Sequence, residues 1–179
     1  MSRRSVQALL LALILLSEAS AKKLTPIAKA RLAKLEADAA LEKQLIEENE
    51  DAVVKSLGGA LIKDLIGPEG QVRSKNYFVK YYTPWCGHCK KMAPEFEMLA
   101  EVVDAESYRD AQGRTGKYSD VTVAQINCDD WRDACVEDSS IQGFPTLKLY
   151  KKDGSVVDYD GTRVTDEMLA FLDRELELV

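Results

Sequence analysis

Two cysteines, Cys86 and Cys89, lie where an expected strand gives way to an expected helix, and this arrangement constrains the fold more than any other feature of the chain. Residues 77–82, Tyr-Phe-Val-Lys-Tyr-Tyr, are aromatic and β-branched and predict a buried strand. Apolar side chains then recur at helical spacing over residues 89–103. A Cys-X-X-Cys pair between a strand and a helix favours a redox dithiol over half of a zinc site.

The position of the two thiols predicts different roles for them. Only a thiolate attacks a disulfide, and a free cysteine is mostly protonated near neutral pH. Cys86 is expected at the N-terminus of the helix, where unpaired N–H groups and the helix dipole stabilise negative charge. His88 adds a candidate positive neighbour, although a lone histidine is more often a surface residue. Cys89 lies one turn deeper and is the expected resolving thiol, and Gly87 completes the motif.

Two segments carry a resemblance to a known family. Residues 85–96, Trp-Cys-Gly-His-Cys-Lys-Lys-Met-Ala-Pro-Glu-Phe, resemble the active-site segment of protein disulfide isomerase domains in the thioredoxin superfamily. Residues 141–148, Ile-Gln-Gly-Phe-Pro-Thr-Leu-Lys, are similar to that family's second signature. The resemblance runs from about Tyr77 to the C-terminus. It implies an α/β thioredoxin fold, a central mixed sheet flanked by helices, preceded here by a helical N-terminal arm.

The resemblance also implies roles for residues outside the dithiol. The bond between Phe144 and Pro145 is expected to be cis and to face the dithiol, and substrate segments are expected to lie extended beside Pro145 and Trp85. Arg163 resembles the family's mobile arginine, which can swing toward the resolving cysteine. An exposed arginine without a role is the alternative for Arg163.

A second pair of cysteines, Cys128 and Cys135, lies at the end of an expected strand and on the short helix after it. Disulfide isomerase domains often carry an accessory pair here, so the resemblance implies a structural disulfide. A second redox site and a four-cysteine zinc site are the alternatives. An even number of cysteines also fits an oxidising compartment.

One position departs from the pattern of the family. Thioredoxin-like proteins usually place a buried carboxylate six residues before the first active-site cysteine, and this chain has Lys80 there. The usual basic partner on the neighbouring strand is replaced by Gln125. Desolvation lowers the pKa of a buried lysine, so Lys80 is one candidate for a neutral base beside the dithiol. Alternatively, its side chain extends to a carboxylate or to solvent and contributes nothing.

The remaining elements are expected around this centre. An N-terminal helix is expected to begin with Thr25 as its cap and Pro26 in its first position. Asp51 to Ile66 is predicted to be a second helix, with no good first strand visible before it. The other expected elements are a strand at 121–127, a short helix at 131–138, a hairpin of strands 146–150 and 156–159 around Asp153-Gly154, and a closing helix from Thr165.

The first 21 residues predict a secretory signal peptide, since basic residues precede a short apolar run and small residues for cleavage. The run is too short to span a bilayer. The predicted domains are the signal peptide at 1–21, a helical arm at 22–50 and a thioredoxin-like domain at 51–179. The last residues, Glu-Leu-Glu-Leu-Val, lack a KDEL-type retrieval signal. Both the endoplasmic reticulum lumen and secretion are therefore expected locations.

The sequence predicts a thiol–disulfide oxidoreductase of the disulfide isomerase type for secretory-pathway proteins. The formal net charge of −6, without a basic cluster, argues against a nucleic-acid partner. The Cys86–Cys89 dithiol is the expected redox centre, and no metal or other cofactor is implied. Two alternatives are an adaptor or chaperone module whose helical arm binds a partner, and a dedicated disulfide reductase.

Overall fold

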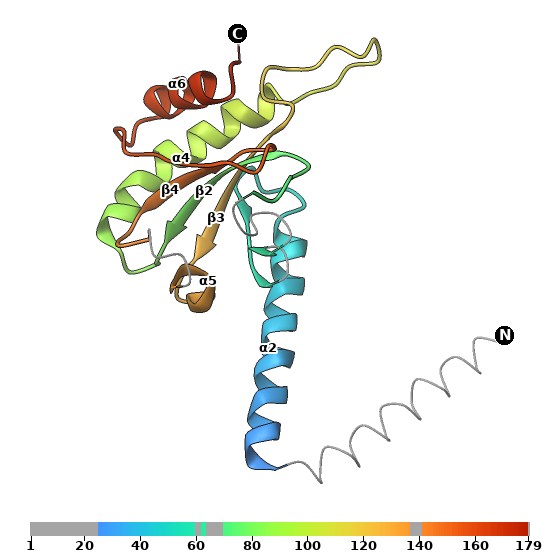
Figure 1. The fold of residues 1–179 in the computed structure, drawn as a ribbon, viewed down its shortest axis with the longest axis vertical. Helices are drawn as coiled ribbons and strands as arrows, with labels where there is room; N and C mark the ends of the chain where they lie inside the picture. Colours follow the sequence, from blue (N-terminus) through green and yellow to red (C-terminus); the bar gives the residue numbers. More distant parts are fainter. Residues whose placement is uncertain (1–24, 60–61, 64–69, 137–140, 179) are drawn as a thin grey trace, which may run out of the picture. The chain divides into compact units, whose positions relative to one another are not determined.

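The structure is a computed structural model that describes residues 25–59, 62–63, 70–136 and 141–178 (Figure 1). The predicted signal peptide lies outside the described residues. The chain divides into two compact units, Met1–Leu41 and Glu42–Val179. None of the helices in the described part of the chain is both long and apolar enough to cross a membrane.

The predicted N-terminal helix is confirmed as α2 (Pro26–Glu48). The N–H of Ala28 donates to the hydroxyl of Thr25 at 3.3 Å, so Thr25 caps the helix. Pro26 occupies the first helical position, where its missing N–H removes no helical hydrogen bond.

The last turns of α2 belong to the second unit, which begins at Glu42. The reason is local packing around Gly58. A Cβ atom added to Gly58 would lie 2.6 Å from Leu45 Cδ1 and 2.5 Å from the ring of Trp131. Glycine therefore allows the chain to approach both side chains closely.

A mixed five-stranded sheet forms the centre of the second unit. Its strands are β1 (Lys55–Ser56), β2 (Asn76–Tyr82), β3 (Val121–Asn127), β4 (Thr146–Tyr150) and β5 (Val156–Asp158), in the spatial order β1-β3-β2-β4-β5. Strand β3 runs parallel to β1 and β2, whereas β4 runs antiparallel to β2 and β5. The predicted α/β class with a mixed sheet is confirmed, and strands β2 to β5 agree with the predicted ranges to within one residue.

The predicted helix over residues 51–66 is wrong in its first half. Residues 55–56 form β1, which pairs with β3, and of the described residues that follow, 59, 62 and 63 are helical. The missing first strand is therefore present but only two residues long. A strand of that length is too short to show an alternating pattern, so the apolar spacing around it favoured a helix.

Asn49 holds β1 from the side opposite to β3. Its Nδ2 donates to the carbonyl of Ser56 at 2.7 Å, and the N–H of Ser56 donates to its Oδ1 at 2.7 Å. Lys55 Nζ donates to the carbonyl of Asn49 at 2.6 Å. These three contacts tie the end of α2 to the first strand.

Helices α4 (Gly87–Ala105) and α6 (Thr165–Glu175) cover one face of the sheet (Figure 1). Successive side chains of a strand point to opposite faces, so Phe78 and Lys80 of β2 face α4. Phe78 is fully buried, with its ring 6.1 Å from that of Phe96 and 5.8 Å from that of Phe171. This aromatic cluster packs both helices onto the sheet behind the dithiol.

The opposite face of the sheet has its own buried layer, which includes Tyr81, Tyr150 and the accessory cysteines. The hydroxyls of Tyr81 and Tyr150 are hydrogen-bonded at 2.6 Å. Cys128, directly after β3, forms a disulfide with Cys135 on the short helix α5 (Arg132–Val136). The disulfide therefore closes a short loop beside the sheet.

Replacing both Cys128 and Cys135 with alanine should destabilise the fold by about 2–3 kcal/mol, because the bridge restricts the unfolded chain over a loop of eight residues. Urea unfolding of the oxidised proteins would measure the loss. In strong reductant the wild-type chain and the variant should unfold at the same urea concentration. Equal midpoints under oxidising conditions would contradict the prediction.

Candidate active site

Cys86 is the N-cap of α4, four residues after β2 ends at Tyr82. The N–H of Cys89 donates to Cys86 Sγ at 3.4 Å, and the N–H of Cys86 donates to the carbonyl of Thr83 at 3.2 Å. Cys86 is partly exposed, whereas Cys89 is buried, and both are free thiols. The structure therefore brings the two predicted thiols together with only the outer one open to a partner.

The pKa of Cys86 is lowered and that of Cys89 is raised, as their predicted roles as nucleophile and resolving thiol require. The pKa of Cys86 is lowered, first by a hydrogen bond from the side chain of Cys89 and further by backbone hydrogen bonds from Cys89 and His88. Burial, together with the neighbouring Cys86, raises the pKa of Cys89 to about 11. Cys86 is consequently the thiol that ionises first.

His88 contributes to this difference through its main chain. Its imidazole is exposed, and the hydrogen bond that lowers the pKa of Cys86 comes from its backbone. The predicted role of the imidazole stays a prediction. A Cβ atom added to Gly87 would meet no atom within 4 Å, so the surface over the dithiol is open there.

Trp85 is 69% exposed, yet its indole has a defined partner. Nε1 of Trp85 donates to Asp129 Oδ1 at 3.1 Å. Asp129 is the second residue after β3, and its N–H donates to Asn127 Oδ1 at 3.1 Å. Asp129 is not among the site residues predicted from the sequence. The available signal was its place after β3, because parallel strands such as β2 and β3 end on the same side of a sheet.

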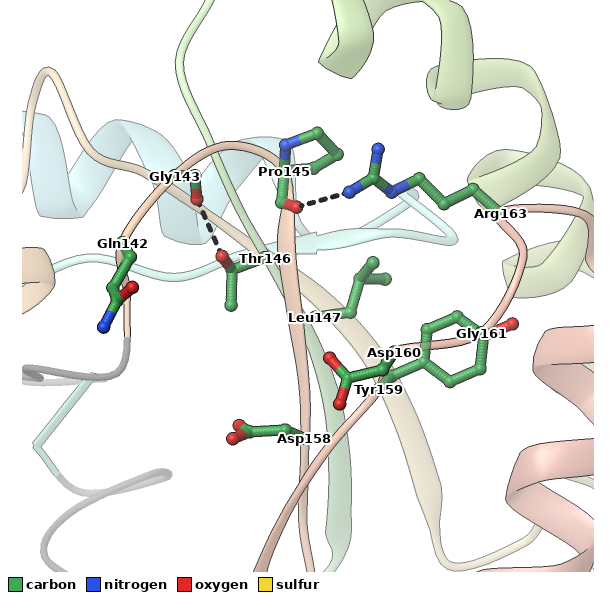
Figure 2. Close-up of a pocket in the computed structure, with 10 residues that line it drawn as sticks. All are labelled: Gln142, Gly143, Pro145, Thr146, Leu147, Asp158, Tyr159, Asp160, Gly161 and Arg163. Carbon is green, nitrogen blue, oxygen red and sulfur yellow. Dashed lines mark hydrogen bonds between the residues drawn. The ribbon is translucent and has the colours of Figure 1, made fainter.

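Residues 141–148, the second signature, include a loop that contacts Cys86. The Phe144–Pro145 bond is cis, and Cys86 Sγ donates to the carbonyl of Phe144 at 3.4 Å. Arg163 Nη2 donates to the carbonyl of Pro145 at 3.2 Å (Figure 2). The charge of Arg163 lowers the pKa of Cys86, whereas the resemblance implied an arginine that acts on Cys89.

A pocket of about 280 Å³ adjoins Pro145 on the side of β4 and β5. Figure 2 shows Gln142 on one side of it and the carboxylates of Asp158 and Asp160 on the other, with Arg163 near Pro145. Its full lining is Gln142, Gly143, Pro145, Thr146, Leu147, Asp158, Tyr159, Asp160, Gly161 and Arg163. The pocket therefore offers charged and polar groups next to the loop that contacts Cys86.

Lys80 is 5% exposed, so its side chain does not extend to solvent. Its Nζ lies 4.5 Å from the ring centroid of Phe96 and 5.2 Å from that of Tyr82. None of the ion pairs among the described residues involves Lys80. Burial lowers the pKa of Lys80 to about 8, and the charges of Cys89 and Glu97 oppose that shift.

Comparison with known proteins gives the chain a family. Residues 69–174, more than half of the chain, match the family model described as Thioredoxin. The chain belongs to the thioredoxin family. Both site segments of this thioredoxin domain, residues 85–96 and 141–148, lie inside the matched region.

Several curated relatives of the thioredoxin domain are named as disulfide isomerases. "Protein disulfide-isomerase 1" of Dictyostelium discoideum is 40% identical over 101 residues, which cover 55% of this chain and 24% of that protein. "Probable protein disulfide-isomerase A6" of Medicago sativa is 36% identical over 103 residues, 57% of this chain and 25% of that protein. The chain thus spans about a quarter of the length of these relatives.

The fold of the domain is also that of solved thioredoxin structures. The crystal structure of the J-Trx1 fragment of ERdj5 superimposes with a TM-score of 0.56 at 21% identity, covering 70% of this chain and 52% of that one. The expected thioredoxin fold is therefore confirmed.

Proposed function

We propose that the thioredoxin domain is a thiol–disulfide oxidoreductase of the disulfide isomerase type, which acts on cysteines of other proteins. One observation carries the proposal: a partly exposed Cys86 with a lowered pKa caps α4, and a buried Cys89 with a raised pKa lies one turn behind it. A nucleophile needs a thiolate, and a resolving thiol needs to wait until the nucleophile has reacted. The names of the curated relatives support the same activity.

The proposed reaction starts from the dithiol. The Cys86 thiolate attacks one sulfur of a substrate disulfide, the substrate S–S bond breaks, and the other substrate sulfur leaves as a thiolate. Cys89 then loses its proton and attacks Cys86 Sγ, which releases the second substrate thiolate and leaves a Cys86–Cys89 disulfide. The substrate gains the pair of electrons that the dithiol loses. The reverse sequence oxidises a substrate dithiol.

Rearrangement of disulfides uses the first half of this reaction. A substrate thiolate attacks the mixed disulfide at its substrate sulfur and frees Cys86, so no electrons are lost overall. The redox centre is the dithiol itself, and the reaction needs no further cofactor.

The surface around Cys86 suits an extended protein segment. The exposed ring of Trp85, held by Asp129, provides an apolar contact on one side. The loop of Phe144 and Pro145 lies on another, with the pocket beyond it. We propose that substrate cysteines reach Cys86 between these two features.

We propose a location in the secretory pathway, either in the endoplasmic reticulum lumen or after secretion. The predicted signal peptide at residues 1–21 and the names of the curated relatives support it. Helix α2, the helical arm, is a candidate surface for a partner.

The experiment that tests the activity compares Cys86→Ala with Cys89→Ala in refolding of a substrate protein with scrambled disulfides. Cys86→Ala should reduce turnover to the uncatalysed rate. Cys89→Ala should accumulate mixed disulfides with the substrate, visible on non-reducing gels, because the resolving thiol is gone. The matched control is the Cys128→Ala/Cys135→Ala double variant, which keeps both active-site thiols and should form no such adducts.

Turnover by Cys86→Ala would contradict the proposal. A second measurement distinguishes an adaptor from an oxidoreductase. If the chain is an adaptor, a variant that lacks both Cys86 and Cys89 should still bind its partner. That variant should also restore function in cells that lack the wild-type protein.

A further inference from the structure

Lys80 is a buried titratable group that the reaction described above leaves unused. It lies on the face of β2 that packs against α4, with its Nζ 4.5 Å from the ring centroid of Phe96. Phe96 and Cys89 are seven residues apart on α4, and both are buried. Residues two turns apart share one face of a helix, so Lys80 and the resolving thiol lie in the same layer between α4 and the sheet.

The charges of Lys80 and Cys89 act on each other. A Cys89 thiolate raises the pKa of Lys80, and the Lys80 ammonium lowers the pKa of Cys89. A backbone hydrogen bond from Thr83, three residues after Lys80, also lowers the pKa of Cys89. Lys80 on β2 and Thr83 directly after it therefore favour the Cys89 thiolate, against the larger effects of burial and Cys86.

The other neighbours of Lys80 compete weakly for its proton. Tyr82 lies beside it on β2, and exposed Glu97 of α4 acts on it less than Cys89 does. The residues in register on β3 and β4 are Gln125 and Leu147, which carry no charge. Among the neighbouring charges, that of Cys89 consequently has the largest effect on the pKa of Lys80.

We propose that Lys80 is the proton acceptor for Cys89 when the mixed disulfide is resolved. The neutral amine takes the proton of the Cys89 thiol and leaves a thiolate beside an ammonium. The thiolate attacks Cys86 Sγ, the Cys86–Cys89 bond forms, and the bond to the substrate breaks with its electron pair on the substrate sulfur. The ammonium then returns its proton to the departing thiolate through solvent.

Burial makes this lysine suitable as a base near neutral pH. With a pKa of about 8, about a tenth of Lys80 is neutral at pH 7, whereas an ordinary exposed lysine is almost fully protonated. The rate of resolution should therefore rise with pH to a plateau whose midpoint is near pH 8. Without this acceptor, the rate of resolution would follow the ionisation of Cys89 and would keep rising up to about pH 11.

The proposal rests on the function proposed above. Its test uses rapid mixing to measure two rates separately: attack of Cys86 on the substrate disulfide, and resolution of the mixed disulfide by Cys89. Lys80→Met should slow resolution about 10²-fold at pH 7, the lower end of general-base contributions. Attack by Cys86 should stay unchanged, because Lys80 does not contact that thiol in the proposed step. Lys80→Glu should resolve faster than Lys80→Met, since a carboxylate also accepts a proton.

Lys148→Met is the matched control. Lys148 is a second buried lysine of the same sheet, 4% exposed, and pairs with Asp158 at 2.9 Å. On β4, its neighbours Leu147 and Leu149 point to the face of the sheet that packs against α4. Successive side chains of a strand point to opposite faces, so Lys148 points away from Cys89. Its replacement should leave the rates of attack and of resolution unchanged.

An unchanged rate of resolution in Lys80→Met would overturn the proposal. A wild-type profile without a midpoint near pH 8 would also overturn it, and that measurement needs no variant. Failure of the proposed function would look different, since the first attack by Cys86 would itself be absent.

Discussion

Lys80→Met should stabilise the folded chain by about 3 kcal/mol at pH 7, despite removing a charged residue from a sheet. Burial lowers the pKa of Lys80 from 10.5 in the unfolded chain to about 8. Each pKa unit corresponds to about 1.4 kcal/mol of preference for the neutral form, so holding the ammonium in this site costs the native state a few kcal/mol. Methionine has a similar length and carries no charge to desolvate.

The difference in stability between Lys80→Met and the wild-type chain should depend on pH. Below pH 8 the lysine is protonated in both the folded and the unfolded chain, so the full cost is present. Between pH 8 and 10.5 the folded chain binds fewer protons, and its stability relative to the variant rises. The advantage of Lys80→Met should therefore shrink as pH rises through this window.

Urea unfolding of both proteins at pH 7 and pH 9.5 would measure the difference. Lys148→Met is again the control, and it should lose stability because it removes the partner of Asp158. A Lys80→Met variant no more stable than the wild-type chain at pH 7 would show that the site does not disfavour the ammonium.

Cys86 should react with iodoacetamide at least about 10²-fold faster than Cys89 at pH 7. With a pKa of about 11, roughly one Cys89 in 10⁴ is ionised at this pH, whereas a pKa below 9.0 leaves at least about one Cys86 in 10² as thiolate. The lower intrinsic nucleophilicity of a low-pKa thiolate offsets part of this ratio. The burial of Cys89 adds to it.

Mass spectrometry of the protein with only the Cys86–Cys89 pair reduced would measure both rates. Labelling of Cys89 should increase about tenfold per pH unit well above neutrality, since its thiolate fraction does so. In urea the two cysteines should react at similar rates, because the fold creates the difference. Similar rates in the folded protein would contradict the proposed roles of the two thiols.

The two predicted effects of Lys80→Met have opposite consequences for the protein. The variant should be more stable, yet slower to release its mixed disulfide. Such opposition is common where an active site keeps a group in an unfavourable environment. Lys80→Met therefore tests whether the cost of burying an ammonium in this fold accompanies a gain in turnover.

The sequence was sufficient to predict the features that depend on local patterns. Strand β2 and helix α4 were expected because aromatic and β-branched residues precede Cys86 and apolar residues at helical spacing follow Cys89. Strand β3 agrees with its predicted range, residues 121–127. These segments are long enough for the period of their buried side chains to be recognised.

Features that depend on distant partners were not predicted. Strand β1 exists because residues 55–56 pair with β3, about 70 residues away in the chain. Asp129 matters because it meets Trp85 only in the folded domain. The sequence placed Lys80 on a strand, but whether its amine reaches solvent depends on Phe96 and Tyr82, which cover it.

The contacts between Asn49 and Ser56 also limit how other chains can associate with this sheet. Leu57 directs its N–H to the carbonyl of Gln125 on β3, so the main-chain groups of Ser56 point outward. Unpaired groups on an outer strand act as a template for a further strand. Here the amide of Asn49 occupies both groups. A substrate segment or a second copy of the chain would therefore have to displace Asn49 before it could pair with β1.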